Sequence, residues 1–263
     1  MPKFKGRPGN SATKPKAPEV RFEQLGHGVE VFRLPEWEAV RRIIERGGGR
    51  KVGGHFSWKM AGHVVYESGP EERCVRLMDV HPSIEAFHAQ PETIRVTTEC
   101  SKPFRYTPDF LAVISGVEAR IEVKRERDLR PPRPVSPHDE RGRRRWERAR
   151  DVRSRLREVR AAYRRCGLLW MLLLDTGMAA MGDPETVDEL IANGGRHITD
   201  ADRVRLHDHL VASGGTSTLG AAADAIREAS DPRGTVLARV SEGALAVDLH
   251  APLDRGAAVI LVR

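Results

Sequence analysis

An aspartate, a glutamate and a lysine lie in two neighbouring stretches of the sequence that are typical of buried strands. Asp109 follows Pro108 inside a β-rich run, and Glu122 and Lys124 come 13 and 15 residues later in the next run. A carboxylate inside a sheet is costly unless it is paired or binds a metal. Residues two apart share one face of a strand, so Glu122 and Lys124 point the same way. If the strands are adjacent, Asp109 and Glu122 converge on one hard cation, and such oxygen ligands suit Mg²⁺.

A third carboxylate is expected near the start of a preceding helix, where Glu67, Glu71 and Glu72 are the choices. Glu67 precedes the helix and Glu72 shares a face with polar residues, whereas Glu71 shares one with apolar residues and points toward the sheet. The apolar residues on that face are Cys74, Val75 and Met78. The alternative is a capping box, because Ser68 and Glu71 have the spacing that satisfies free N–H groups of a first helical turn. The pattern leaves both roles open.

Hydrophobic periodicity predicts the elements that position these residues. A helix is expected from Leu34-Pro35 to the glycines at 47–49, and a second from Ser68 to about Asp79. The predicted strands lie at 62–66, 93–97, 105–114 and 118–124. A long Arg-rich helix begins near residue 136, and the apolar run 168–174 that follows it is predicted to be a strand buried on both faces.

The composition changes after residue 183, where Ala, Asp and Gly become frequent. Beyond this point the patterns predict helices at 199–212, 216–229 and 233–242 and strands at 244–249 and 257–262. Three helices followed by two strands have the outline of a winged-helix domain, related to the helix-turn-helix DNA readers. Residues 181–263 carry eight Arg against 13 acidic residues, which argues against phosphate contacts. A protein-docking module is the equal alternative.

Charge is distributed unevenly along the chain, whose formal net charge is +7. Residues 120–165 hold 17 Arg and one Lys against eight acidic residues. A basic band beside a predicted active site suits a polyanion, because Arg and Lys displace the counterions condensed on phosphates. A helix with a solvated Arg-rich face has the same composition, so composition alone does not decide between the two.

Other features argue against several classes of protein. There is no run of about 18 apolar residues, and the N-terminus is basic and Pro-rich, so we expect neither a membrane span nor a signal peptide, and a cytoplasmic location. The three cysteines are far apart and fit neither a disulfide framework nor a CxxC zinc site. A zinc site made by histidines is disfavoured, because His207 and His209 are too close for one helix face and His81 and His88 flank a turn.

The order and spacing of four motifs resemble those of a known family. The motifs are Ser68-x-x-Glu71, Gln90-Pro91, the run from Tyr106 to Leu111 and the run from Ile121 to Lys124. Over roughly residues 50–178 the chain resembles the TnsA-like transposon endonucleases, members of the PD-(D/E)xK nuclease superfamily. The resemblance implies metal ligands at Glu71, Asp109 and Glu122 with the Val123 carbonyl. It also implies a catalytic lysine at Lys124, with Mg²⁺ as the cofactor and Mn²⁺ as a substitute.

The resemblance further implies a role in DNA transposition. The chain would be an endonuclease subunit that hydrolyses one strand of double-stranded DNA at each transposon end, in the bacterial cytoplasm and associated with the nucleoid. A DDE-type transposase would cut the other strand, and an AAA+ ATPase would regulate both. Basic residues after Lys124 and in the long helix are expected to contact phosphates beside the cut. These are Arg125, Arg127, Arg143, Arg144, Arg145 and Arg148.

The expected fold class is α/β, with a restriction-endonuclease-like mixed sheet flanked by helices and a smaller C-terminal winged-helix-like domain. The expected parts are a disordered basic arm at 1–20, a lead-in segment at 21–50, a nuclease domain at 51–180 and the winged-helix-like domain at 181–263. Two other functions stay open: a stand-alone restriction, repair or junction-resolving nuclease of the same superfamily, and a non-catalytic DNA-binding adaptor.

Overall fold

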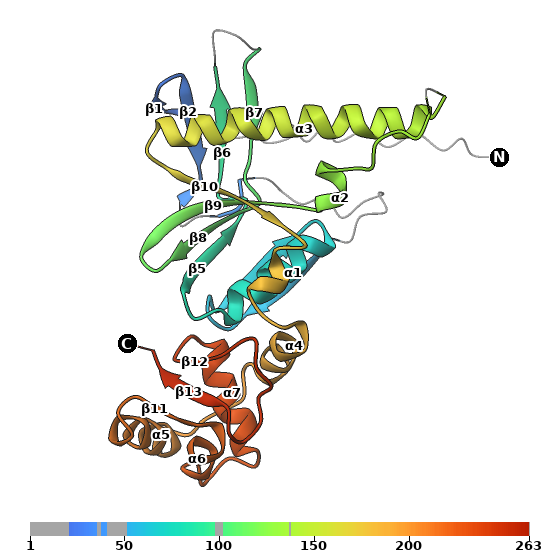
Figure 1. Cartoon of the computed structure of the whole chain (residues 1–263). Helices are drawn as coiled ribbons and strands as arrows, with labels where there is room; N and C mark the ends of the chain where they lie inside the picture. The colour runs from blue at the N-terminus through green and yellow to red at the C-terminus, as the bar shows by residue number, and fades with distance from the viewer. Residues whose placement is uncertain (1–20, 36–37, 41–51, 98–101, 137, 263) are drawn as a thin grey trace, which may run out of the picture.

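The structure is a computed structural model that describes residues 21–35, 38–40, 52–97, 102–136 and 138–262 (Figure 1). Its first part contains β1 (Glu23–Gly26), β2 (Val29–Arg33), β3 (Gly53–Ser57), β4 (Gly62–Tyr66), α1 (Gly69–Val80), β5 (Ile84–Ala89), β6 (Glu92–Val96), β7 (Phe104–Tyr106), β8 (Phe110–Ile114), β9 (Val117–Lys124), α2 (Glu126–Leu129), α3 (Glu140–Arg165) and β10 (Leu169–Leu174). The chain is therefore of the mixed α/β class, as predicted.

In the described residues the first part contains two four-stranded sheets and the antiparallel pair β3-β4. One has the order β10-β9-β8-β5, in which β9 pairs with β10 in parallel and the other pairs are antiparallel. The other has the order β1-β2-β6-β7 and is antiparallel throughout. Apolar residues of α1 share a core with β5, β8 and β9, whereas those of α3 pack on the second sheet and on Trp170 of β10. Helices thus lie against both sheets (Figure 1).

The stretch 105–114, predicted as one strand, is two strands that belong to different sheets. β7 pairs with β6, and β8 pairs with β5 and β9. The prediction of one strand was wrong because Pro108, at the break, has no N–H to continue a ladder. The chain changes sheets there, and Asp109 lies at the entrance to β8.

A buried ion-pair cluster ties the two sheets together. The Glu92 carboxylate of β6 accepts hydrogen bonds from Arg33 at 2.7 Å and from Arg120 of β9 at 3.2 Å. Glu92 and Arg120 are almost fully buried. Buried charges need partners of this kind, so the cluster fixes how the sheets meet.

The apolar strand after α3 is not buried on both faces. β10 is an edge strand, and three of its residues are exposed by 39 to 45%: Leu169, Met171 and Leu172. The prediction of a fully buried strand was wrong because an apolar run has the same composition whether one or two strands flank it. Within the described ranges no helix is both long enough and apolar enough to cross a membrane.

Hydrophobic periodicity did not predict the two N-terminal strands, β1 and β2. β1 and β2 form a hairpin whose second strand pairs with β6 from Val29 opposite Val96 to Arg33 opposite Glu92. Most of the helix predicted from Leu34-Pro35 onward lies outside the described residues, as does the basic arm at 1–20.

The second part of the chain consists of α4 (Pro184–Asn193), α5 (Asp200–Ala212), β11 (Thr216–Thr218), α6 (Leu219–Asp224), α7 (Pro232–Ser241), β12 (Leu245–Val247) and β13 (Ala258–Leu261). β11, β13 and β12 form an antiparallel sheet in that order. The segment predicted as a helix at 216–229 is β11 followed by the short α6. Helix α4 was not predicted, although Asp183 caps it and Pro184 occupies its first turn.

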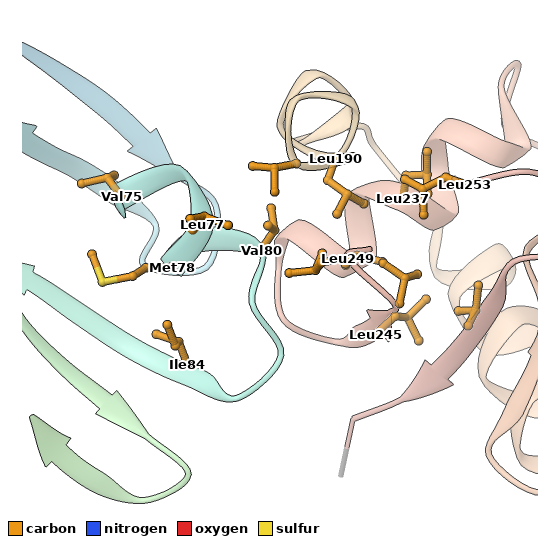
Figure 2. Packing of buried hydrophobic residues seen from close by; sticks show 14 of the residues in the cluster. Val75, Leu77, Met78, Val80, Ile84, Leu190, Leu237, Leu245, Leu249 and Leu253 are labelled. Carbon is orange, nitrogen blue, oxygen red and sulfur yellow. The ribbon is translucent and has the colours of Figure 1, made fainter. Parts of the chain in front are cut away.

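The two parts share one hydrophobic core (Figure 2). In this cluster Leu77 and Val80 of α1 lie with Leu190 of α4, Leu237 of α7 and Leu249. Each is buried, by 94% or more. Residues 181–263 therefore stabilise α1 directly.

Aromatic packing adds a second contact between the parts. The Trp58 ring, in the turn after β3, lies against Gly194 and Gly195, where an added Cβ would approach the ring to 2.5 and 1.9 Å. Gly195 also has a φ of +73°, a conformation that glycine adopts readily. Only a residue without a side chain fits at this position.

Lys59 closes the C-terminal end of α1. Its Nζ donates hydrogen bonds to the carbonyl oxygens of Met78, His81 and Ile84 at 2.7 to 2.9 Å. The last turn of α1 contains no basic residue of its own, so Lys59 supplies the positive charge that the helix end favours.

Replacement of Lys59 by methionine is expected to lower the free energy of unfolding by about 2 kcal/mol, because hydrogen bonds from a charged group are lost. Urea unfolding followed by circular dichroism measures the change. Lys102→Met, at an exposed position, is the matched control and should leave the midpoint unchanged. Equal midpoints for the two variants would show that the Lys59 contacts contribute nothing to stability.

Candidate active site

The structure brings the predicted aspartate, glutamate and lysine together at one end of two paired strands. Asp109 immediately precedes β8, and Glu122 and Lys124 are in the last three residues of β9. The strands are antiparallel neighbours, with Phe110 opposite Ile121. The start of β8 therefore lies beside the end of β9, which is the adjacency that the motif spacing required.

Backbone contacts orient Asp109. Its Oδ2 accepts a hydrogen bond from the Val123 N–H at 2.8 Å, and its carbonyl accepts one from the Gln90 N–H at 2.9 Å. Gln90 is 95% buried and has a φ of +47°, in the left-handed region that non-glycine residues rarely adopt. Strain of this kind persists where surrounding structure holds it, and here it supports the segment that carries Asp109.

Glu122 is buried and held from two sides. The Tyr106 hydroxyl donates to its Oε2 at 2.5 Å and in turn accepts a hydrogen bond from the Trp170 indole at 3.0 Å. Burial raises the pKa of the Glu122 carboxyl and the Asp109 carboxylate raises it further, against the opposing effect of Lys124. Burial also raises the pKa of Tyr106 well above its ordinary value, so its hydroxyl remains a neutral donor.

The Lys124 ammonium lies among oxygen atoms. It contacts Glu122 Oε1 closely, lies 3.7 Å from Asp109 Oδ2 and donates to the Val123 carbonyl at 3.1 Å. Burial acts to lower the pKa of Lys124, but the surrounding carboxylates outweigh it and the pKa is raised. Its positive charge therefore stabilises a group of negative charges that would otherwise repel one another.

Glu71 fulfils the capping role and also interacts electrostatically with Asp109 and Lys124. Its carboxylate accepts hydrogen bonds from the Glu67 N–H at 2.7 Å and the Ser68 hydroxyl at 2.8 Å, and Ser68 caps α1. Burial raises the pKa of Glu71 and the Asp109 carboxylate raises it further, whereas these hydrogen bonds and Lys124 lower it. The capping alternative is thus realised, and the same carboxylate interacts with Asp109.

Oxygen atoms dominate this site, and a hard divalent cation prefers oxygen ligands. Among the described residues no three His, Cys, Asp or Glu side chains lie as a preformed metal cluster. The oxygens of Asp109, Glu122 and the Val123 carbonyl nevertheless lie around the Lys124 ammonium. Carboxylate and carbonyl oxygens are ligands that suit Mg²⁺ or Mn²⁺, so the chemistry of this set fits such a cation.

The predicted phosphate-binding arginines fall into two groups. The Arg125 guanidinium lies 4.0 Å from the position of a Cβ on Gly69, in the first turn of α1, which also carries Glu71. The others lie farther along α2 and α3. Arg127, Arg145 and Arg148 line one hollow between these helices, and Arg144, Arg145 and Arg148 line another with Glu140 and Arg141. Arg143 is exposed in the first turn of α3.

Three residues of the site were not assigned roles from the sequence. Tyr106 and Gln90 were recognised as parts of motifs, yet their contacts to Glu122 and Asp109 depend on sheet packing. Trp170, which positions Tyr106, lies near the start of the apolar run at 168–174. A tryptophan in a predicted strand could have indicated a polar contact of this kind, because a buried indole N–H needs a hydrogen-bond acceptor.

Comparisons with known proteins complete the description of this site. A scan against models of known protein families and a search of curated proteins both return no match to the chain.

Proposed function

We propose that the chain is a Mg²⁺-dependent DNA endonuclease. One observation carries the proposal: Asp109, Glu122, the Val123 carbonyl and Lys124 gather at the end of a strand pair with Glu71 in electrostatic range. This set of groups suits hydrolysis of a phosphodiester. The mixed sheet with helices against it supports a restriction-endonuclease-like fold for the first part.

In the proposed mechanism the chain positions water and phosphate for in-line attack. A bound Mg²⁺ would lower the pKa of a water molecule and neutralise charge on the phosphate. Asp109, Glu122 and the Val123 carbonyl would hold the cation, with Glu71 as a further carboxylate. The Lys124 ammonium orients the attacking water and stabilises the negative charge that develops on the phosphate oxygens. Tyr106 keeps Glu122 in place by its hydrogen bond.

Double-stranded DNA is the proposed substrate. Arg125 lies at the site, and the arginines of α2 and α3 extend a basic surface away from it. Phosphate contacts from such a surface fix the position of the duplex without reading its sequence. The resemblance of the motifs supports cleavage of one strand at transposon ends beside a DDE-type transposase and an AAA+ ATPase. The same site would also serve a stand-alone restriction, repair or junction-resolving nuclease.

We further propose that residues 181–263 form a winged-helix-like module that contacts protein. The order α5, β11, α6, α7, β12, β13 supports the likeness. In helix-turn-helix proteins the second helix of the motif enters the major groove. The corresponding helix here is α7, in which eight of the ten residues are buried. A buried helix is not available to a DNA groove, so docking of a partner protein is favoured.

The experiment is nicking of supercoiled plasmid by the purified chain. We expect nicking with Mg²⁺ or Mn²⁺, none with EDTA, and none by Asp109→Asn. Asp208→Asn, an exposed aspartate on α5, is the matched control and should be fully active. DNA binding without cleavage under every metal condition would contradict the proposal and favour the adaptor. Cleavage of a defined transposon end only when the transposase is added would separate transposition from stand-alone activity.

A further inference from the structure

The open edge of β10 is an apolar feature that the proposed nuclease does not use. Among the residues that the structure describes, β10 pairs only with β9, and Leu169, Met171 and Leu172 are each exposed by about two fifths. An edge strand presents unpaired N–H and C=O groups and is a template for a further strand. Proteins usually blunt such edges with charge or proline, yet β10 has the sequence LWMLLL.

A groove of about 750 Å³ runs along this edge. Its floor is made of consecutive β10 residues, from Leu169 to Leu172 and then Leu174. Successive residues of a strand point to opposite faces of the sheet, so both faces contribute to the lining. A groove lined in this way follows the edge itself, where the main chain is reachable.

The wall opposite β10 is strongly basic. It is lined by Arg130, Arg150, Arg153, Arg157 and Arg160, and no carboxylate lines the groove among the described residues. Arg130 pairs with Glu126, Arg150 pairs with Asp151, and Arg153 donates to the Leu129 carbonyl. Arg157 and Arg160 are exposed and make no ion pair with any residue that the structure describes. The groove therefore combines an apolar floor with uncompensated positive charge.

We propose that this groove binds an extended segment of a partner protein in which acidic and apolar residues alternate. The segment adds to β10 as a fifth strand of the sheet. Its main chain pairs with the open edge, and its apolar side chains lie on the sheet face of Leu169 and Met171. Its carboxylates lie on the other face, the side of α3, and face Arg157 and Arg160.

Charge favours an acidic and apolar peptide over the other possible occupants of the groove, which are a second copy, residues 1–20 and DNA. A second copy paired edge to edge would place two arginine-rich walls side by side. The chain's own residues 1–20 carry five basic residues and a single acid, Glu19, and so repel the wall. A DNA strand would satisfy the arginines but leave the apolar floor uncovered. An acidic and apolar peptide satisfies the wall, the floor and the backbone edge together.

The test uses the full chain and a fluorescent seven-residue probe peptide that alternates Glu with Val and Leu. We expect saturable binding by anisotropy, and slower amide hydrogen exchange at residues 169–174 when the peptide is bound. The same peptide with Lys in place of Glu should bind at least tenfold more weakly. The double variant Arg157→Glu and Arg160→Glu should reverse this preference, whereas Arg164→Glu with Arg165→Glu, on the same helix outside the groove, should not.

Several results would overturn the proposal. The proposal would be wrong if neither peptide bound, or if the Glu and Lys peptides bound with equal affinity. It would also be wrong if the bound peptide slowed amide hydrogen exchange at residues other than 169–174. Dimers in sedimentation that Leu172→Glu abolishes would assign the edge to a second copy, and loss of duplex binding in the Arg157 and Arg160 double variant would assign the groove to DNA. Unchanged plasmid nicking by the Arg157 and Arg160 double variant would show that the groove and the proposed nuclease site are separate.

Discussion

Replacing Lys124 by methionine is expected to lower Mg²⁺-dependent nicking at least about 100-fold, the usual cost of removing one group that stabilises transition-state charge. The ammonium lies between Glu122 and Asp109, where water and phosphate would react in the proposed mechanism. Nicking rates at saturating Mg²⁺, measured on supercoiled plasmid, give the change. Methionine keeps the length of the side chain and removes its charge, so packing is largely preserved.

The same variant has a second, independent readout. Without Lys124 the carboxylate of Glu122 loses its counter-charge, and the melting temperature in EDTA should fall below that of the native chain. A cation bound by the remaining oxygens would stabilise the variant, so Mg²⁺ should raise its melting temperature more than that of the native chain. Lys102→Met serves as control for both measurements. Undiminished nicking would remove Lys124 from the mechanism, and a melting temperature insensitive to Mg²⁺ would argue against a cation at this position.

Leu237→Ala is expected to lower the free energy of unfolding by about 3 kcal/mol, as for other large-to-small changes in a core. Leu237 is fully buried in α7, in the cluster that α1 shares with α4 (Figure 2). Because this core spans both parts of the chain, the loss should destabilise both. All four tryptophans lie before residue 181, so tryptophan fluorescence reports the first part and, through Trp58, its contact with Gly194 and Gly195.

The measurement is urea unfolding followed by tryptophan fluorescence and by circular dichroism. Both signals of Leu237→Ala should shift to lower urea by the same amount. Val204→Ala, at a valine of α5 that is 57% exposed, should shift neither. If the fluorescence transition of Leu237→Ala stayed in place while the circular dichroism signal split, the two parts would unfold independently and the shared core would not couple them.

Local patterns in the sequence predicted two of the elements that carry candidate site residues. Helix α1 with its Ser68 cap and the strand with Glu122 and Lys124 were placed within a residue or two. Periodicity and capping depend on residues that are close in sequence, which explains this agreement. The adjacency of the strands beside Asp109 and Glu122 was a condition of the predicted metal site, and the pairing of β8 with β9 meets it.

Features that depend on distant neighbours could not be predicted in this way. The exposure of β10 depends on whether another strand lies beside it, which its own residues do not encode. The hydrogen-bond chain from Trp170 through Tyr106 to Glu122 joins three separate strands. The break at Pro108 was a missed signal of another kind, because proline marks the end of a ladder and the two flanking runs were similarly rich in β-formers.

Helix α1 spans 12 residues, or about 18 Å. Glu71 lies in its first turn, and its far end is held by Lys59 and by the leucines of α4 and α7. A short helix held at both ends transmits a displacement of one end to the other. A partner that displaces α4 or α7 is therefore expected to change the separation of Glu71 and Asp109, so residues 181–263 are connected mechanically to these carboxylates through α1.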